Sequence, residues 1–183
     1  MQGFEFREGQ QFVHAFNQTP MGYGLPAAIG AAFARPGQRI VLVSGDGGFM
    51  LNIQELALLA RHRLPIKIIL FNNQGHAMCR QTQEQWLGGK YYSTSIEGGL
   101  CFPNFCDITQ AFGLRDHWVR TNSQIDSALT DLLAGDVPAI LEVEIDGSHR
   151  LVPQVQMGRP NEDGGPALPR EELAEQMIVG VVP

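Results

Sequence analysis

The chain is organised around Gly45-Asp46-Gly47-Gly48, which directly follows the apolar run Arg39-Ile40-Val41-Leu42-Val43-Ser44. A second apolar run, Ile66-Lys67-Ile68-Ile69-Leu70-Phe71, ends in Asn72-Asn73-Gln74-Gly75. Short apolar runs that stop at such turn residues are typical of buried parallel strands. Ligands bind at the carboxyl ends of the strands in open α/β sheets, so we expect a site where these two runs end.

The residues at the two strand ends suit a phosphate group and a hard cation. Glycines allow backbone N–H groups to approach phosphate oxygens closely. Asp46 and Asn73 offer the oxygen ligands that Mg²⁺ takes, and we expect both side chains to be exposed. A lone Gly-Asp-Gly is usually an ordinary turn, and Asn-Gln-Gly an ordinary loop. The order of the two motifs, with 24 residues between Gly47 and Asn72, favours the site instead.

Alternating apolar and amphipathic segments predict an α/β fold, a doubly wound parallel sheet with helices on both faces. The first expected helix covers 22–35, and a second one begins at a capping box at Asn52. Further helices are expected over 103–112, 124–134 (opened by Ser123) and 171–178. The later strands are expected over 117–120 and 139–145. The small residues of 22–35 indicate close packing, either in the core or at a subunit face. Residues 75–100 show no clear period. We expect one domain over 1–150 and a surface tail over 151–183.

Composition excludes several classes of protein. At 183 residues and 44% hydrophobic content, the chain can bury a sizeable core. A net charge of −6 gives no basic surface for nucleic acid or an anionic membrane. The sequence contains no apolar run of about 20 residues, the length of a membrane span. Three irregularly spaced cysteines form no disulfide framework, which favours a cytoplasmic protein with reduced thiols.

The paired motifs resemble the signature of the thiamine diphosphate enzymes, GDG followed at this spacing by NN. The resemblance implies thiamine diphosphate and Mg²⁺ as cofactors. It assigns the metal to the side chains of Asp46 and Asn73 and to the carbonyl of Gly75. Contacts to the diphosphate would come from the Gly45-Asp46-Gly47-Gly48 turn and from Gly75, His76, Ala77 and Met78.

The segment Thr19-Pro20-Met21-Gly22-Tyr23-Gly24-Leu25 resembles the acetohydroxyacid synthase group in particular. In that group the residue matching Met21 is an apolar wedge that bends the cofactor into a V shape. The carbonyl of Thr19 would accept a hydrogen bond from the aminopyrimidine ring. A buried core methionine is the alternative for Met21.

Residues after the NN motif are candidates for contact with substrate. His76 could shuttle a proton above the thiazolium, and a capping or solvent-facing histidine is an equal alternative. The resemblance also implies that Met78, Arg80 and Gln81 face the substrate. Thr82 stands nearest to the position where true acetohydroxyacid synthases carry a tryptophan, so the reaction catalysed stays open.

The family activates its cofactor with a glutamate on a separate pyrimidine-binding domain, and this sequence has no room for that domain. The resemblance begins part-way into the family's diphosphate domain, which leaves open whether the first strand is present. We therefore expect a fragment or subunit that is inactive alone, and a homo-oligomer or a complex with a pyrimidine-domain chain. The expected chemistry is decarboxylation of a 2-oxo acid and acyl transfer to a second carbonyl. The alternatives are a subunit of a simple decarboxylase and a non-catalytic assembly domain.

Overall fold

The computed structural model describes residues 4–15, 17–155 and 158–181, which fall into two compact units. The first unit comprises residues up to Gln74 together with Phe102–Ile145, and the second comprises Gly75–Cys101 and the residues from Asp146 onward. The expected division into a domain over 1–150 and a tail over 151–183 stays a prediction. None of the helices in the described part of the chain is long and apolar enough to cross a membrane.

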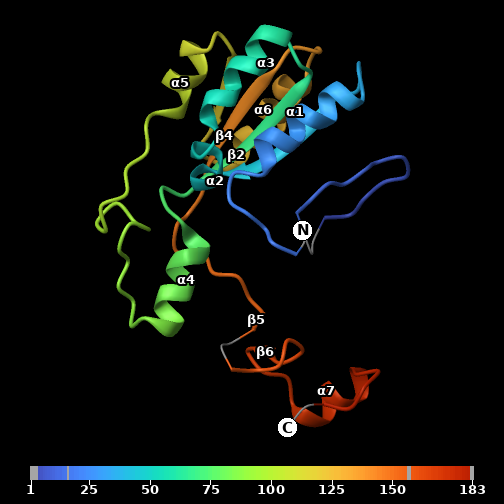
Figure 1. Cartoon of the computed structure of the whole chain (residues 1–183), viewed down its shortest axis with the longest axis vertical. Helices are drawn as coiled ribbons and strands as arrows, with labels where there is room; N and C mark the ends of the chain where they lie inside the picture. The colour runs from blue at the N-terminus through green and yellow to red at the C-terminus, as the bar shows by residue number, and fades with distance from the viewer. Residues whose placement is uncertain (1–3, 16, 156–157, 182–183) are drawn as a thin grey trace. The chain divides into compact units, whose positions relative to one another are not determined.

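The first unit is built on a parallel four-stranded sheet with the strand order β1-β2-β4-β3. Figure 1 shows the two central strands, β2 and β4, side by side. The strands are β1 (Ile40–Gly45), β2 (Ile66–Asn72), β3 (Arg115–Val119) and β4 (Ala139–Glu144). The register pairs Gly45 with Phe71, so β1 and β2 reach the same edge of the sheet. This arrangement confirms the predicted α/β fold and places the two motifs next to each other.

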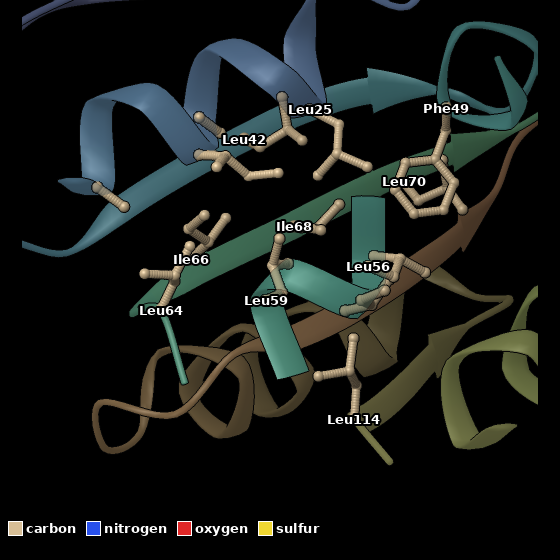
Figure 2. Close-up of a cluster of buried hydrophobic side chains, with 14 of the residues drawn as sticks. Leu25, Leu42, Phe49, Leu56, Leu59, Leu64, Ile66, Ile68, Leu70 and Leu114 are labelled. Carbon is tan, nitrogen blue, oxygen red and sulfur yellow. The ribbon is translucent and has the colours of Figure 1, made fainter. Parts of the chain in front are cut away.

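Two apolar clusters lie on the two faces of this sheet. The helices of the first unit are α1 (Gly24–Ala34), α2 (Asp46–Met50), α3 (Leu56–His62), α5 (Phe105–Ala111) and α6 (Ile125–Leu133), with short 3-10 turns η1 (Ile53–Glu55) and η2 (Asn122–Gln124). Figure 2 shows Leu25 of α1, Leu59 of α3 and Ile68 of β2 packed together on one face. On the other face, Leu132 of α6 packs in a second cluster with Leu141 of β4. Helices on both faces are therefore confirmed.

The small residues of α1 serve packing inside the unit. Ala28 and Ala32 belong to the core, and a Cβ added at Gly24 would lie 2.9 Å from Cδ1 of Leu42. Of the two alternatives for these residues, the structure supports the core. An exposed apolar surface lies elsewhere, because Val41 and Val43 of β1 are 49% and 59% exposed.

Two predicted helix starts are wrong in their details. Asn52 forms no capping box; its Nδ2 donates instead to the carbonyl of Gly22 at 2.9 Å. The capping box before α6 is made by Thr121 and Gln124 rather than by Ser123. In the first case Asn52 bonds a carbonyl 30 residues earlier in place of its own helix start, and in the second the cap residue lies two positions before the predicted one.

The second unit contains a helix that the sequence period did not reveal, α4 (Ala77–Trp86). The antiparallel pair β5 (Gln154–Val155) and β6 (Gly164–Gly165) and helix α7 (Arg170–Gln176) complete this unit. Arg150 binds Glu84 of α4, with Nε 2.7 Å from Oε2. Distant segments thus hold α4 in place, which explains why its polar sequence predicted no helix.

Candidate functional site

Asp46 links the ends of β1 and β2. It follows Gly45, the last residue of β1, and its side chain is only 2% exposed. Its Oδ1 accepts the backbone N–H of Gly47 at 2.7 Å, and its Oδ2 accepts that of Asn73 at 3.1 Å. The expectation of an exposed Asp46 is wrong, because the carboxylate bonds to two backbone N–H groups at the sheet edge. Such bonds to an ionised acceptor are short and strong.

The side-chain amide oxygen of Asn73, Oδ1, is buried and has no hydrogen-bond donor among the described residues. Buried polar atoms almost always have a partner, so an orphaned one requires an explanation such as a water molecule or an ion. An amide oxygen close to a carboxylate is a suitable pair of ligands for Mg²⁺, and the residues present therefore fit this metal.

The described residues contain no group of three or more His, Cys, Asp and Glu side chains that could hold a metal ion. The candidate cation site consequently depends on one carboxylate, one amide and backbone carbonyls. Magnesium sites of this kind are completed by substrate or cofactor phosphates and by water.

The glycines beside Asp46 leave room for a ligand. A Cβ added at Gly45 would meet no described atom within 4 Å. At Gly48 the nearest atoms to an added Cβ would be the backbone nitrogen of Gly22, at 3.7 Å, and Oγ of Ser44, at 3.8 Å. Gly47 is buried next to the carboxylate whose Oδ1 it binds. These observations are compatible with a phosphate near the turn, and the contacts themselves remain a prediction.

The turn that contains Thr19 and Met21 approaches this edge through Gly22. Gly22 has a φ of +86°, and a Cβ there would lie 2.5 Å from Nδ2 of Asn52, so only glycine suits the position. Met21 is 49% exposed and is not a buried core methionine. Thr19 has a φ of +37°, and its backbone N–H donates to the carbonyl of Ala15 at 2.8 Å. The wedge and the aminopyrimidine contact remain predictions for these two residues.

The remaining predicted site residues, Gly75, His76, Ala77 and Met78, belong to the second unit. Gly75 is tightly enclosed there, since an added Cβ would lie 2.9 Å from the carbonyl oxygen of Thr94. His76 occupies the N-cap position of α4, and its backbone N–H donates to the same carbonyl at 3.0 Å. Ala77 begins α4, and Met78 is 53% exposed. Their roles toward a cofactor stay predictions.

Gln81 does not present its side chain for substrate. It is 6% exposed, its Oε1 accepts the backbone N–H of Leu151 at 2.9 Å, and its Nε2 donates to the carbonyl of Leu151 at 2.9 Å. Arg80 likewise donates to the carbonyl of Gly147 at 2.8 Å. Both side chains fix the chain after β4 to α4 inside the second unit.

Sequence reasoning missed two polar residues that shape the site. Asn52 holds the turn at Gly22, as described above, and Glu142 lies 9% exposed in β4, where its Oε1 accepts from Nδ2 of Asn72 at 2.6 Å. A carboxylate inside the otherwise apolar run of β4 was the available signal, because unpaired charges are rarely buried. Burial, together with the charges of Glu142 and Asp116, also raises the pKa of the Cys106 thiol to about 12.

Comparison with known proteins gives this site a family. Residues 1–143 match the family described as "Thiamine pyrophosphate enzyme, C-terminal TPP binding domain". The chain is 37% identical over 154 residues to the acetolactate synthase isozyme 2 large subunit of Escherichia coli, covering 84% of this chain and 28% of that protein. It is 39% identical over 141 residues to the acetolactate synthase large subunit of Porphyra purpurea, covering 77% of this chain and 24% of the relative.

The chain spans about a quarter of the length of these curated relatives. The match nevertheless includes both strand-end motifs and the whole parallel sheet up to Val143. The chain therefore belongs to the C-terminal thiamine pyrophosphate-binding domain family of the thiamine pyrophosphate enzymes.

Proposed function

We propose that this chain is the diphosphate- and Mg²⁺-binding part of an acetolactate synthase-like enzyme that acts on 2-oxo acids. The observation that carries the proposal is the hydrogen bond from the backbone N–H of Asn73 to Oδ2 of Asp46, which joins the carboxylate to the residue whose side chain carries the orphaned Oδ1. The family match supports the cofactor, and the acetolactate synthase relatives support the class of substrate.

In this proposal Asp46, Asn73 and the carbonyl of Gly75 hold the cation. A carboxylate presents about four lone-pair sites, so Asp46 can hold backbone N–H groups and a cation together. The Gly45–Gly48 turn and the segment from Gly75 to Met78 orient the diphosphate. When bound, thiamine diphosphate supplies the carbanion chemistry and the electron sink for decarboxylation. The residues of this chain bind and orient it.

The activating glutamate is proposed to come from a pyrimidine-binding domain outside this sequence. The described residues expose apolar surface on the sheet of the first unit, at Val41, Val43 and Phe71. Parallel sheets are normally covered on both faces. This surface supports our proposal that the chain works in an oligomer. We also propose that the chain is inactive alone, because it lacks the activating glutamate, and that it is cytoplasmic, because its three cysteines form no disulfide framework.

The test is the binding of thiamine diphosphate and Mg²⁺ to the protein in its natural assembly, measured by calorimetry. We expect Mg²⁺-dependent binding in the parent and its loss in Asn73→Ala, while Asn122→Ala, an exposed asparagine of η2, binds like the parent. Equal affinity in the parent and in Asn73→Ala would remove the basis of the site.

The same assembly, supplied with 2-oxo acids, tests the reaction. A longer hydroxyketone product supports acyl transfer to a second carbonyl. Free aldehyde would instead identify a simple decarboxylase. Cofactor binding without turnover, with the glutamate-bearing domain present, would identify a non-catalytic domain and refute the enzymatic proposal.

A further inference from the structure

A buried carboxylate on β4 lies behind the strand end that presents Asn73. Glu142 is 9% exposed, and its two oxygens bind different elements. Oε1 accepts from Nδ2 of Asn72 at 2.6 Å, and Oε2 accepts from Sγ of Cys106 in α5 at 3.8 Å. Among the described residues, no Lys, Arg or His side chain forms an ion pair with Glu142.

Asn72 connects this carboxylate to the turn after β2. Its Nδ2 points at Glu142, and its Oδ1 accepts the backbone N–H of Gln74 at 3.0 Å. An ionised carboxylate only accepts hydrogen bonds, so it allows one orientation of the Asn72 amide. The opposite orientation would face oxygen to oxygen and leave the Gln74 N–H without this acceptor.

The bond to Gln74 matters because that residue is held in an unfavourable conformation. Gln74 has a φ of +53°, in the left-handed region that residues with a Cβ rarely adopt. Asn73, which carries the orphaned oxygen, lies between Asn72 and Gln74 in the chain. The orientation of the Asn73 side chain therefore depends on the bonds that fix its two neighbours.

We infer that Glu142 is a positioning residue for the cation site and that it acts through the Asn72 amide. The inference rests on the proposed function, since it takes Asn73 as a metal ligand. A purely structural carboxylate would gain little here, because a buried charge without a cationic partner is costly and a neutral side chain is often tolerated better. Outer residues that orient ligands typically change metal affinity by about 10- to 100-fold when they are replaced.

The experiment measures Mn²⁺ affinity by electron paramagnetic resonance, with thiamine diphosphate present, on the protein in its natural assembly. Glu142→Gln removes the charge and the strict orientation with little change of shape, and we expect it to weaken Mn²⁺ binding at least about tenfold. Glu144→Gln is the matched control, because it removes an exposed carboxylate two residues along the same strand, beside Asn72 in the register. We expect its affinity to stay within about twofold of the parent, the size of ordinary surface effects.

A double-mutant cycle tests the route through Asn72. If Glu142 acts through that amide, Glu142→Gln should have no further effect on Mn²⁺ affinity once Asn72 is alanine. Cys106→Ala, which releases only the other carboxylate oxygen, should bind like the parent. Urea midpoints of all variants verify that they fold.

Each outcome decides the matter. A parent that binds no Mn²⁺ overturns the proposed function and the inference with it. A parent that binds, with Glu142→Gln equal to it, overturns only the inference. Additive losses in the double variant, or an equal loss in Glu144→Gln, show that Glu142 acts by charge or general stability and also overturn it.

Discussion

Replacement of Asn73 by alanine should separate metal binding from stability. The buried Oδ1 of Asn73 has no hydrogen-bond donor among the described residues, and an unsatisfied buried polar atom costs about 1–3 kcal/mol. The variant removes this cost together with some packing. In the presence of a chelator we therefore expect Asn73→Ala to unfold with a free energy within about 1 kcal/mol of the parent, or above it.

Asp46→Ala is expected to behave differently without metal. Its carboxylate accepts two backbone N–H groups, at 2.7 Å and 3.1 Å, in a position that is 2% exposed. Hydrogen bonds to charged groups contribute about 1.5–3 kcal/mol each, so the loss of both lowers the free energy of unfolding by about 3 kcal/mol or more. The two predicted metal ligands should thus differ in the chelated protein.

Stabilisation by bound Mg²⁺ and thiamine diphosphate supplies the second half of the test. At a concentration of 100 times the Kd, a ligand that binds only the folded state stabilises it by about 2.7 kcal/mol. Urea unfolding, followed by circular dichroism with and without Mg²⁺ and thiamine diphosphate, should show this increment in the parent and in Asn122→Ala. We expect neither Asn73→Ala nor Asp46→Ala to show it. The reasoning is refuted if Asn73→Ala keeps the full increment, or if it is as unstable as Asp46→Ala in chelator.

Three further predictions concern other sites. Gly45→Ala places a methyl group where no described atom lies within 4 Å, so we expect an unchanged free energy of unfolding. The Kd for thiamine diphosphate should nevertheless rise about tenfold, which corresponds to about 1.4 kcal/mol. Gly30→Ala in α1, where an added Cβ is equally unobstructed, should leave that Kd unchanged. Burial raises the pKa of Cys106 from 9.0 to about 12, so iodoacetamide should alkylate Cys106 at pH 8 at least about 100-fold more slowly than the exposed Cys101. Mass spectrometry measures both alkylation rates, and equal rates would contradict this prediction. Desolvation, followed by the charges of neighbouring arginines, lowers the pKa of the fully buried Lys67 below 10.5, so its charge destabilises the fold at neutral pH. The unfolding free energy of the parent should therefore rise relative to that of Lys67→Met as the pH approaches 10.5. A difference between the two proteins that does not change with pH would show that the pKa of Lys67 is not lowered.

The sheet was predictable because its signals are local. The apolar runs of β1, β2 and β4 begin and end within about two residues of the observed strands, and they stop at Gly45, Asn72 and Asp146 respectively. The adjacency of Asp46 and Asn73 followed from the general geometry of parallel sheets. Local pattern was therefore sufficient for the fold and for the adjacency of Asp46 and Asn73.

The missed features depend on contacts between distant parts of the sequence. Helix α4 has a polar sequence and is held by Gln81, Glu84 and Gln85, which bind Leu151, Arg150 and Gln154 respectively. The burial of Asp46 depends on the backbone of Asn73, and the partner of Asn52 is a carbonyl 30 residues earlier. A polar side chain can form its hydrogen bond with a neighbour in the sequence or with a distant residue, and the local sequence is the same in both cases. The partners of these side chains could therefore not be predicted from local pattern.

The enclosure of Gly75 constrains how this lineage can evolve. A side chain at position 75 would collide with the Thr94 carbonyl at 2.9 Å and press on the Arg80 guanidinium at 3.3 Å. A descendant could not gain a second carboxylate beside Asp46 there by a single substitution, since the loop around Thr94 would first have to withdraw. That loop is itself closed, because a Cβ at Gly98 would overlap the carbonyl of Tyr91. A carboxylate at position 75 would therefore require accompanying changes between Arg80 and Gly98.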